Sequence, residues 1–273
     1  MPFSKDILMG SSGQSGASGF YPYQIEHSCR FTLTHADRLT RTPGSAGNRR
    51  TNTFSMWIKR ANPLETYQTV FLQSDDAGTV NRTSSINFQT EDNGSGNLGR
   101  IYSAINGGLE ASLYPVGRFR DTTSWYHLVL RTDTTQATEA NRQRIYINGV
   151  QQTLESSPSY PGQNFETGYC NTTELVIGSN ANANSDYPFS GYLAEVILAD
   201  GTSYGPDQFG ESKSGVWIPK DPSGTTFGTT GFHLKFGDSS SLGADSSGNG
   251  NNFSVNSIGS DHQEIQSPTN GTG

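Results

Sequence analysis

The sequence predicts an all-β protein built as an antiparallel two-sheet jelly-roll sandwich. Only 16% of its 273 residues are charged, whereas 32 residues are glycine, and helices favour the long straight side chains that are scarce here. Short runs of β-branched and aromatic residues recur between clusters of glycine, asparagine, serine and proline, as is typical of strands joined by turns. About a dozen such runs with no convincing helix favour two sheets packed face to face.

The clearest strand signals lie near residues 53–59, 125–130 and 144–147. In the first run, Phe54 alternates with polar or small neighbours, which predicts one face toward the core. The last run ends at Asn148-Gly149, the dipeptide most typical of a two-residue hairpin turn. Further strands are expected near residues 69–72, 85–88, 101–105, 109–113, 174–178, 192–198, 232–236 and 253–255.

We expect one folded domain with an arm and a tail. Residues 25–258 are assigned to the jelly roll, and within it residues 201–258 are expected to return and close the sandwich, with Trp217 holding this extension in place. Residues 259–273 are assigned to a C-terminal tail, because too few residues remain there for another core.

Residues 1–24 form a glycine- and serine-rich arm that ends in the aromatic residues Phe20, Tyr21 and Tyr23. Such a composition buries too little apolar surface to order itself. Most arms of this kind are flexible linkers. The alternative is an assembly arm that becomes ordered on a neighbouring subunit, with the three aromatic side chains as anchors.

Charge and cysteine content exclude several classes of protein. The net charge is −7, which repels phosphate backbones and argues against a nucleic-acid partner. No stretch of about 18 apolar residues is present, so membrane insertion is not expected. The two cysteines, Cys29 and Cys170, are too few for a disulfide framework, and buried free thiols are favoured over a bridge.

Four segments resemble concanavalin A-like domains of the laminin-G type. Residues 125–133 are similar to the family's strand with a Trp-x-His pattern, and residues 145–150 to the Asn-Gly hairpin that follows it. Residues 189–196 resemble the family's Phe-x-Gly strand, with Ala194 where an aspartate is usual, and residues 245–251 resemble its Asp-Ser-Ser-Gly-Asn-Gly turn. The resemblance implies a lectin-like jelly roll over about residues 28–258.

A closer resemblance is to lectin-like structural proteins of marine bacteriophages. It is carried by residues 41–50, 57–60, 133–138, 191–196, 209–211 and 267–270. This resemblance implies a non-enzymatic protein on the exterior of a virion, as a capsid decoration or a tail fibre. It also implies other virion proteins and further copies of this chain as partners, and host-surface polysaccharide as a ligand.

Hydrolysis is not expected. Glucanases of this fold carry carboxylates at alternate positions of one strand, which places an acid and a nucleophile on one sheet face. Here Glu195 and Asp200 stand five residues apart, and Ile197 occupies the middle position. A regular strand would therefore send the two carboxylates to opposite faces. A glycoside hydrolase with displaced carboxylates is the least favoured alternative.

One loop is a candidate calcium site. It carries oxygen-bearing side chains at every second residue, as calcium loops do. A single carboxylate predicts weak affinity, and a solvated connection between two strands fits the same composition. The candidate ligands are Asn180, Asn182, Asn184 and Asp186.

The same loop supplies the candidate sugar contacts. Sugar sites stack an aromatic ring on the sugar and bind its hydroxyls with amides or backbone groups. Tyr187, beside the asparagine-rich loop, is the preferred ring, with Asn182 and Asn184 as polar partners. Other loop tyrosines are Tyr67, Tyr160 and Tyr204, although most loop tyrosines simply cover the rim of a core. A free carbohydrate-binding module is thus the main alternative to the virion protein.

Overall fold

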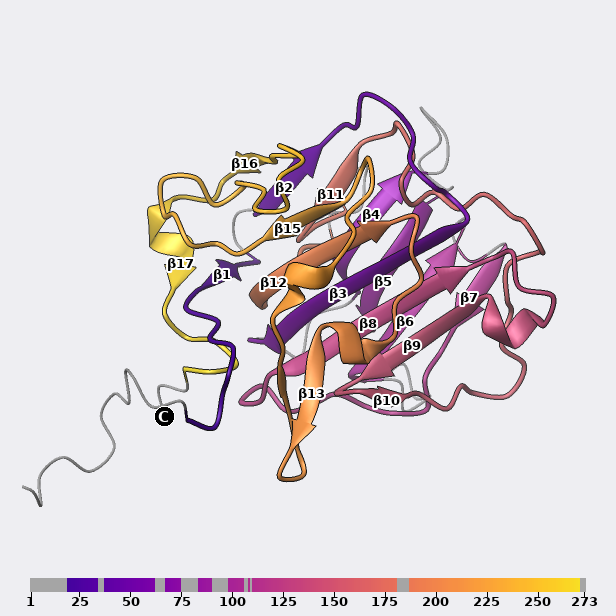
Figure 1. Ribbon diagram of the computed structural model, residues 1–273, viewed down its shortest axis with the longest axis horizontal. Helices are drawn as coiled ribbons and strands as arrows, with labels where there is room; N and C mark the ends of the chain where they lie inside the picture. The colour runs from indigo at the N-terminus through magenta and orange to yellow at the C-terminus, as the bar shows by residue number, and fades with distance from the viewer. Residues whose placement is uncertain are drawn as a thin grey trace, which may run out of the picture.

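Two antiparallel sheets packed face to face make up the fold (Figure 1). The computed structural model describes residues 19–33, 37–61, 67–74, 83–89, 98–105, 108, 110–180 and 187–270. Within these residues the elements are strands and short 3-10 turns, with no α-helix. None of the helical turns in this part of the chain is long and apolar enough to cross a membrane. The predicted all-β sandwich is confirmed.

The larger sheet has eight strands among the described residues. Its path is β10-β9-β8-β3-β12-β1-β17, and β15 pairs with β12 beside that path. The bounds are β1 (Ser28–Phe31), β3 (Thr51–Arg60), β8 (Tyr126–Asp133), β9 (Gln143–Ile147), β10 (Val150–Gln151), β12 (Gly191–Asp200), β15 (Phe232–Leu234) and β17 (Gln263–Glu264).

The second sheet has seven strands in the described part of the chain, in the order β16-β2-β11-β4-β5-β6-β7. The bounds are β2 (Arg38–Arg41), β4 (Gln68–Ser74), β5 (Thr83–Gln89), β6 (Arg100–Ile105), β7 (Ala111–Leu113), β11 (Leu175–Ile177) and β16 (Ser254–Asn256). A separate hairpin consists of β13 (Gly210–Lys213) and β14 (Val216–Pro219).

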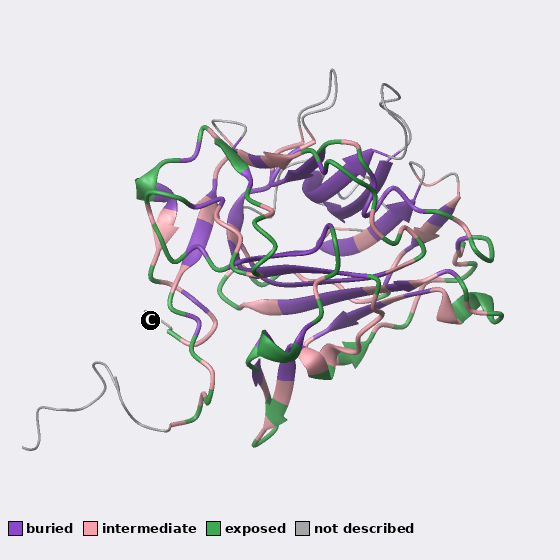
Figure 2. Cartoon of the chain, turned by 45° about the horizontal axis from the view of Figure 1, so that its top comes forward, coloured by how far each residue is buried: buried purple, intermediate pink, exposed green. Residues whose placement is uncertain are grey.

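The core lies between the two sheets, where alternate side chains of each strand point inward. Phe54, Met56 and Ile58 of β3 are buried there, as the alternation predicts. The ring of Phe54 lies 4.1 Å from that of Phe71 on the facing sheet, centre to centre. Burying such side chains stabilises the fold by about 1.5–3 kcal/mol each. Most of both sheets is buried in Figure 2, whereas exposed residues gather in the connections.

Two further predictions from the sequence are confirmed. Asn148 and Gly149 have φ values of 48° and 78° and join β9 to β10 as a tight hairpin, which is the left-handed pair that a type I′ turn requires. Cys29 and Cys170 are both buried free thiols. Burial raises the pKa of each thiol well above its usual value, so both remain protonated and unreactive.

The returning segment reaches both sheets. β15 pairs with β12 in the larger sheet, and β16 pairs with β2 at the edge of the seven-stranded sheet. Between β12 and β15, the β13–β14 hairpin projects from the body of the sandwich (Figure 1).

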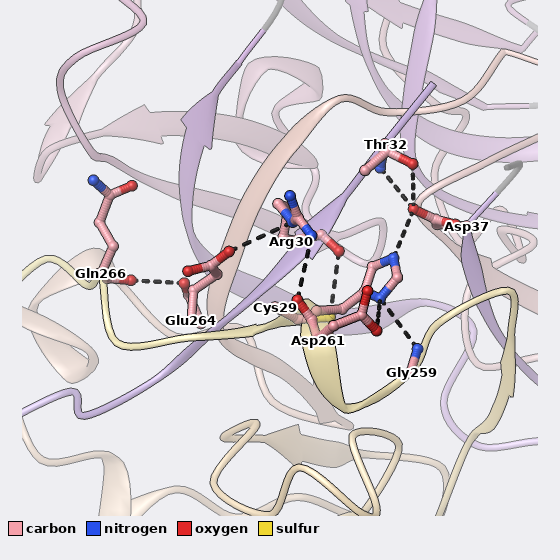
Figure 3. A network of polar contacts seen from close by, with 10 residues as sticks. Cys29, Arg30, Thr32, Asp37, Gly259, Asp261, Glu264 and Gln266 are labelled. Carbon is pink, nitrogen blue, oxygen red and sulfur yellow. Dashed lines mark hydrogen bonds and ion pairs between the residues drawn. The ribbon is translucent and has the colours of Figure 1, made fainter. Parts of the chain in front are cut away.

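The boundary expected at residue 258 is corrected, because β17 extends the larger sheet beyond it by pairing with β1. Arg30 of β1 lies 3.5 Å from the carboxylate of Glu264 (Figure 3). The buried Asp37 accepts hydrogen bonds from the backbone and hydroxyl of Thr32 and lies 3.3 Å from Nε2 of His262. A two-residue strand has no alternation to detect, which is why the sequence did not reveal it.

Candidate functional site

The outer face of the eight-stranded sheet is covered by the chain itself. Trp217 of β14 donates a hydrogen bond from Nε1 to Nδ1 of His127, at 2.9 Å. A Cβ atom at Gly149 would lie 2.4 Å from the Trp217 ring, so the glycine lets the hairpin pack closely. Trp217 therefore pins the extension to the sandwich, as predicted.

Glu195 lies under this cover rather than in an open groove. It occupies a β-bulge of β12 with a φ of 49°. Its Oε2 atom accepts a hydrogen bond from the hydroxyl of Tyr23 at 3.0 Å and lies 2.6 Å from Nε2 of His233. The cavity beside it measures about 10 Å³, which is room for a single water molecule and not for a sugar.

Asp200 has a different environment. Its carboxylate accepts hydrogen bonds from the backbone of Asn48 at 2.6 Å and of Thr230 at 2.8 Å. Like Glu195, it is buried. Glu195 points to the outer face beside Tyr23, while Asp200 binds loop backbone at the end of the strand, so the two carboxylates share no groove.

The outer face of the seven-stranded sheet carries a hollow of about 300 Å³. Its floor is made of small side chains, among them Ser85 of β5 and Ala104 of β6, which stand opposite each other in register. Its walls are four half-buried tyrosines. The hollow exists because short residues lie between tall ones on the same sheet face. The tyrosines are Tyr67, Tyr102, Tyr114 and Tyr187.

The four rings form a continuous row across the strands. Tyr67 lies 5.9 Å from Tyr187 and 6.5 Å from Tyr102, measured between ring centres, and both pairs meet edge to face. Tyr102 lies 5.2 Å from Tyr114. Such contacts hold the rings in place, so this wall of the hollow is preorganised.

A chain of hydrogen bonds orders the polar side chains of the hollow. Thr69 on β4 donates from its hydroxyl to Oδ1 of Asn87 at 3.0 Å, and Nδ2 of Asn87 donates to the hydroxyl oxygen of Ser85 at 2.7 Å. The Ser85 hydroxyl accepts this bond and can still donate its own proton. Rings beside ordered hydroxyl and amide groups are the combination that sugar recognition needs.

The structure places two of the predicted site residues at this hollow. Tyr187 and Asn180 both line it, and the backbone oxygen of Tyr187 accepts a hydrogen bond from Thr69 at 2.9 Å. The predicted residues Asn182, Asn184 and Asp186 lie outside the described residues.

The other loop tyrosines lie elsewhere. Tyr160 lines a separate hollow of about 390 Å³ beside β9, together with Gln143 and Arg144. Although that hollow is larger, Tyr160 is its one aromatic side chain among the described residues. The Tyr204 hydroxyl accepts a hydrogen bond from the backbone of Thr226, which makes Tyr204 part of the cover over the larger sheet.

Two aromatic residues in the described part of the arm, Tyr23 and Phe20, contact other parts of this chain. Tyr23 binds Glu195, and the rings of Phe20 and Tyr21 meet edge to face at 5.1 Å. Phe20 is 39% exposed, with the ammonium group of Lys213 5.7 Å above its ring. Contact of these side chains with a neighbouring subunit stays a prediction.

The predicted calcium site also stays a prediction. Asn180 is the one candidate ligand within the described residues, and it lines the tyrosine-walled hollow. Elsewhere in the described chain, no group of three or more histidine, cysteine, aspartate or glutamate residues is arranged to hold a metal ion. The donor set of three amides and one carboxylate suits a calcium ion of weak affinity.

Sequence reasoning missed Tyr102, Tyr114 and Asn87. A signal for two of them was present, because Asn87 lies between Ile86 and Phe88 and Tyr102 follows Ile101. Alternation places both on the face opposite the core. What the sequence did not show is that β5 and β6 are neighbours, which brings the two side chains into register.

A family model of the concanavalin A-like lectin/glucanases superfamily matches residues 35–202. The chain belongs to this superfamily. The match spans β2 through β12, and thus every strand that lines the hollow. No curated protein matches the chain in sequence.

Solved structures share the fold. A candidate carbohydrate-binding protein from Bacteroides ovatus superposes with a TM-score of 0.59 and 16% identity, covering 86% of this chain and 59% of that one. This chain thus spans less than two thirds of that protein.

Two further structures superpose less closely. A pentraxin from Limulus polyphemus gives a TM-score of 0.47 and 15% identity, covering 68% of this chain and 81% of the pentraxin. Domain 4 of an arabinanase from Geobacillus stearothermophilus, solved with arabinotriose, gives 0.43 and 21%, covering 65% of this chain and 73% of that domain.

Proposed function

We propose that this protein binds carbohydrate in the tyrosine-walled hollow of the seven-stranded sheet. The observation that carries the proposal is the row of four rings beside the hydrogen-bonded side chains of Thr69, Asn87 and Ser85. Sugar rings present apolar C–H faces and a rim of hydroxyl groups, and this hollow offers a partner to each. The concanavalin A-like fold and the similar fold of the candidate carbohydrate-binding protein from B. ovatus support the same function.

The test is a glycan array followed by calorimetry on the best oligosaccharide. Tyr102→Ala removes one of the two inner rings of the row, and we expect affinity to fall at least tenfold, equivalent to about 1.4 kcal/mol. Tyr160→Ala is the matched control, because it removes a similar ring from the separate hollow beside β9. Equal affinity of wild type and Tyr102→Ala, or loss of binding in Tyr160→Ala alone, would refute the assigned site.

We further propose that binding is not followed by hydrolysis. Glu195 is buried beside a water-sized cavity, and Asp200 is bonded to backbone groups elsewhere. Neither carboxylate is placed to act on a sugar in the hollow of the other sheet. Incubation of the protein with the bound glycan should release no reducing ends. If the wild type releases them and Glu195→Gln does not, the glycoside hydrolase alternative is supported instead.

A sequence resemblance favours a second role, display on the exterior of a phage virion with other virion proteins and further copies of this chain as partners. Among the described residues of the arm, Phe20 is the exposed aromatic, and it is available to such a neighbour. Phe20→Ala combined with Tyr21→Ala should then lower the occupancy of the protein on particles, while glycan affinity stays unchanged. Full occupancy would remove this role for the arm.

We propose separately that a calcium ion binds the loop that includes Asn180. Asn180 lines the hollow, so an ion held by this loop would order one wall of the site. Titration of the glycan in calcium and in a chelator distinguishes a calcium-binding loop from a solvated connection between strands. Weaker binding in the chelator supports the calcium loop, and equal binding assigns the loop to a solvated connection.

A further inference from the structure

The described residues that line the tyrosine-walled hollow include no aspartate, glutamate, lysine or arginine. Tyrosine is their one titratable type. Burial, followed by the nearby Tyr114 and Tyr67, raises the pKa of Tyr102 above its usual value. The Tyr102 phenol therefore stays protonated and neutral at ordinary pH. The described part of the lining thus carries no formal charge.

A positive charge does lie on the same sheet face, but it is already paired. Arg100 precedes Tyr102 by two residues on β6, and its side chain is largely buried. One guanidinium nitrogen donates to Glu155 at 2.7 Å, and another donates to Gln89. The guanidinium carbon also lies 4.4 Å from the centre of the Tyr114 ring. The guanidinium of Arg100 is therefore engaged by the Tyr114 ring and by Glu155, a carboxylate that it shares with Arg118.

This arrangement discriminates between neutral and acidic sugars. A hydroxyl group can both donate and accept hydrogen bonds, so it can pair with the Ser85 hydroxyl and the Asn87 amide in either sense. A carboxylate can only accept, and, with no calcium ion in the loop that includes Asn180, it must leave water without gaining a cation. Desolvation of an unpaired charge is costly, and no cation in the described lining offsets that cost.

The length of the tyrosine row sets a second requirement. Tyr67 immediately precedes β4, Tyr102 lies on β6 and Tyr114 immediately follows β7. The ring centres follow one another at 5.9 Å from Tyr187 to Tyr67, 6.5 Å from Tyr67 to Tyr102 and 5.2 Å from Tyr102 to Tyr114. Four rings in succession make the row longer than one sugar ring is wide, so the row can contact several units of a chain at once.

We propose that the hollow selects uncharged glycans and holds a stretch of several sugar units along its row of tyrosines. This inference rests on the proposed function of the same hollow. It adds the chemical class of the ligand and its minimum length.

The test uses paired probes that differ only in charge, and it is carried out in a chelator so that no calcium ion occupies the loop that includes Asn180. Neutral oligosaccharides of glucose, mannose and galactose, one to six units long, are each presented beside the same oligosaccharide with its C6 alcohols oxidised to carboxylates. We expect at least tenfold tighter binding of the neutral member of every recognised pair. Affinity should also rise at least tenfold from the monosaccharide to the trisaccharide.

The possible outcomes distinguish failure of this inference from failure of the proposed carbohydrate binding. Equal or tighter binding of the oxidised probes that is lost in Tyr102→Ala would overturn charge selection and leave the carbohydrate site standing. Full affinity for the monosaccharide would overturn the multi-unit site alone. No binding of any probe, together with no hit on a broad array of neutral and acidic glycans, would overturn both the inference and the proposed function.

Discussion

The outer faces of the two sheets differ in what covers them. Over the eight-stranded sheet lie the β13–β14 hairpin and the end of the arm, and they enclose polar groups that are hydrogen-bonded to one another, such as His127 with Trp217 and Glu195 with Tyr23. Over the seven-stranded sheet lies a hollow walled by tyrosines and lined by Thr69, Ser85 and Asn87. One face is closed by the chain, and the other has space for a ligand.

This difference separates stability from recognition. Groups on the covered face make contacts within the chain, so changing them should alter folding and leave glycan affinity intact. Groups that wall the hollow are half-buried, so changing them should alter affinity more than stability. The comparison fails if a substitution on the covered face weakens binding as strongly as it weakens folding.

The largest effect on the covered face is expected from Trp217→Ala. The substitution removes the ring that packs on Gly149 and leaves Nδ1 of the buried His127 without its donor. We expect the free energy of unfolding to fall by about 3 kcal/mol, measured by urea denaturation. Tyr102→Ala is the control from the other face. If Trp217→Ala binds the glycan more weakly under conditions in which the variant is still folded, the two faces are coupled.

The pH dependence of stability gives the next largest effect. His127 donates from Nε2 to Ser55 and accepts at Nδ1 from Trp217, so it is neutral in the fold, and burial lowers its pKa to about 3. Unfolded imidazole titrates near pH 6.5. As the pH falls, the unfolded state binds the proton first, so the stability contributed by His127 is complete above about pH 6.5 and is lost as the pH falls toward 3.

Between pH 7 and pH 5, His127 should therefore cost the fold about 2 kcal/mol of unfolding free energy. Urea denaturation at a series of pH values measures the loss, and His127→Gln is compared to isolate this residue. Ring resonances of His127 should show no titration in the folded protein above pH 5. A titration midpoint near 6.5 would mean that the covered face admits water.

The fold could be predicted from the sequence wherever a local rule applied. Alternation placed Phe54 in the core, and Asn148-Gly149 marked its hairpin because both residues must adopt positive φ. Those rules need only neighbouring residues. They gave no signal for β17, whose two residues pair with β1 from the far end of the chain.

The candidate site could not be predicted, because it depends on a β-bulge and on the strand order, which rules for neighbouring residues do not give. The bulge at Glu195 reverses the alternation of β12, so that Val196 and Leu198 join Leu193 in the core and Ile197 faces outward. No composition signal marks such a bulge. In the same way, Tyr67, Tyr102 and Tyr114 become neighbours only through the strand order of the seven-stranded sheet.

The smallest effect that separates the faces is expected from Tyr23→Phe. The substitution removes one hydrogen bond to the buried Glu195 and leaves that carboxylate with His233. We expect a loss of about 1 kcal/mol of unfolding free energy and faster proteolysis of residues 19–24, because Tyr23 fastens the arm. Tyr21→Phe removes a hydroxyl from the same arm and leaves Glu195 paired, so it should change neither measurement. Equal proteolysis of the two variants would show that the arm is held by its apolar contacts and that the Tyr23–Glu195 bond adds nothing to the cover.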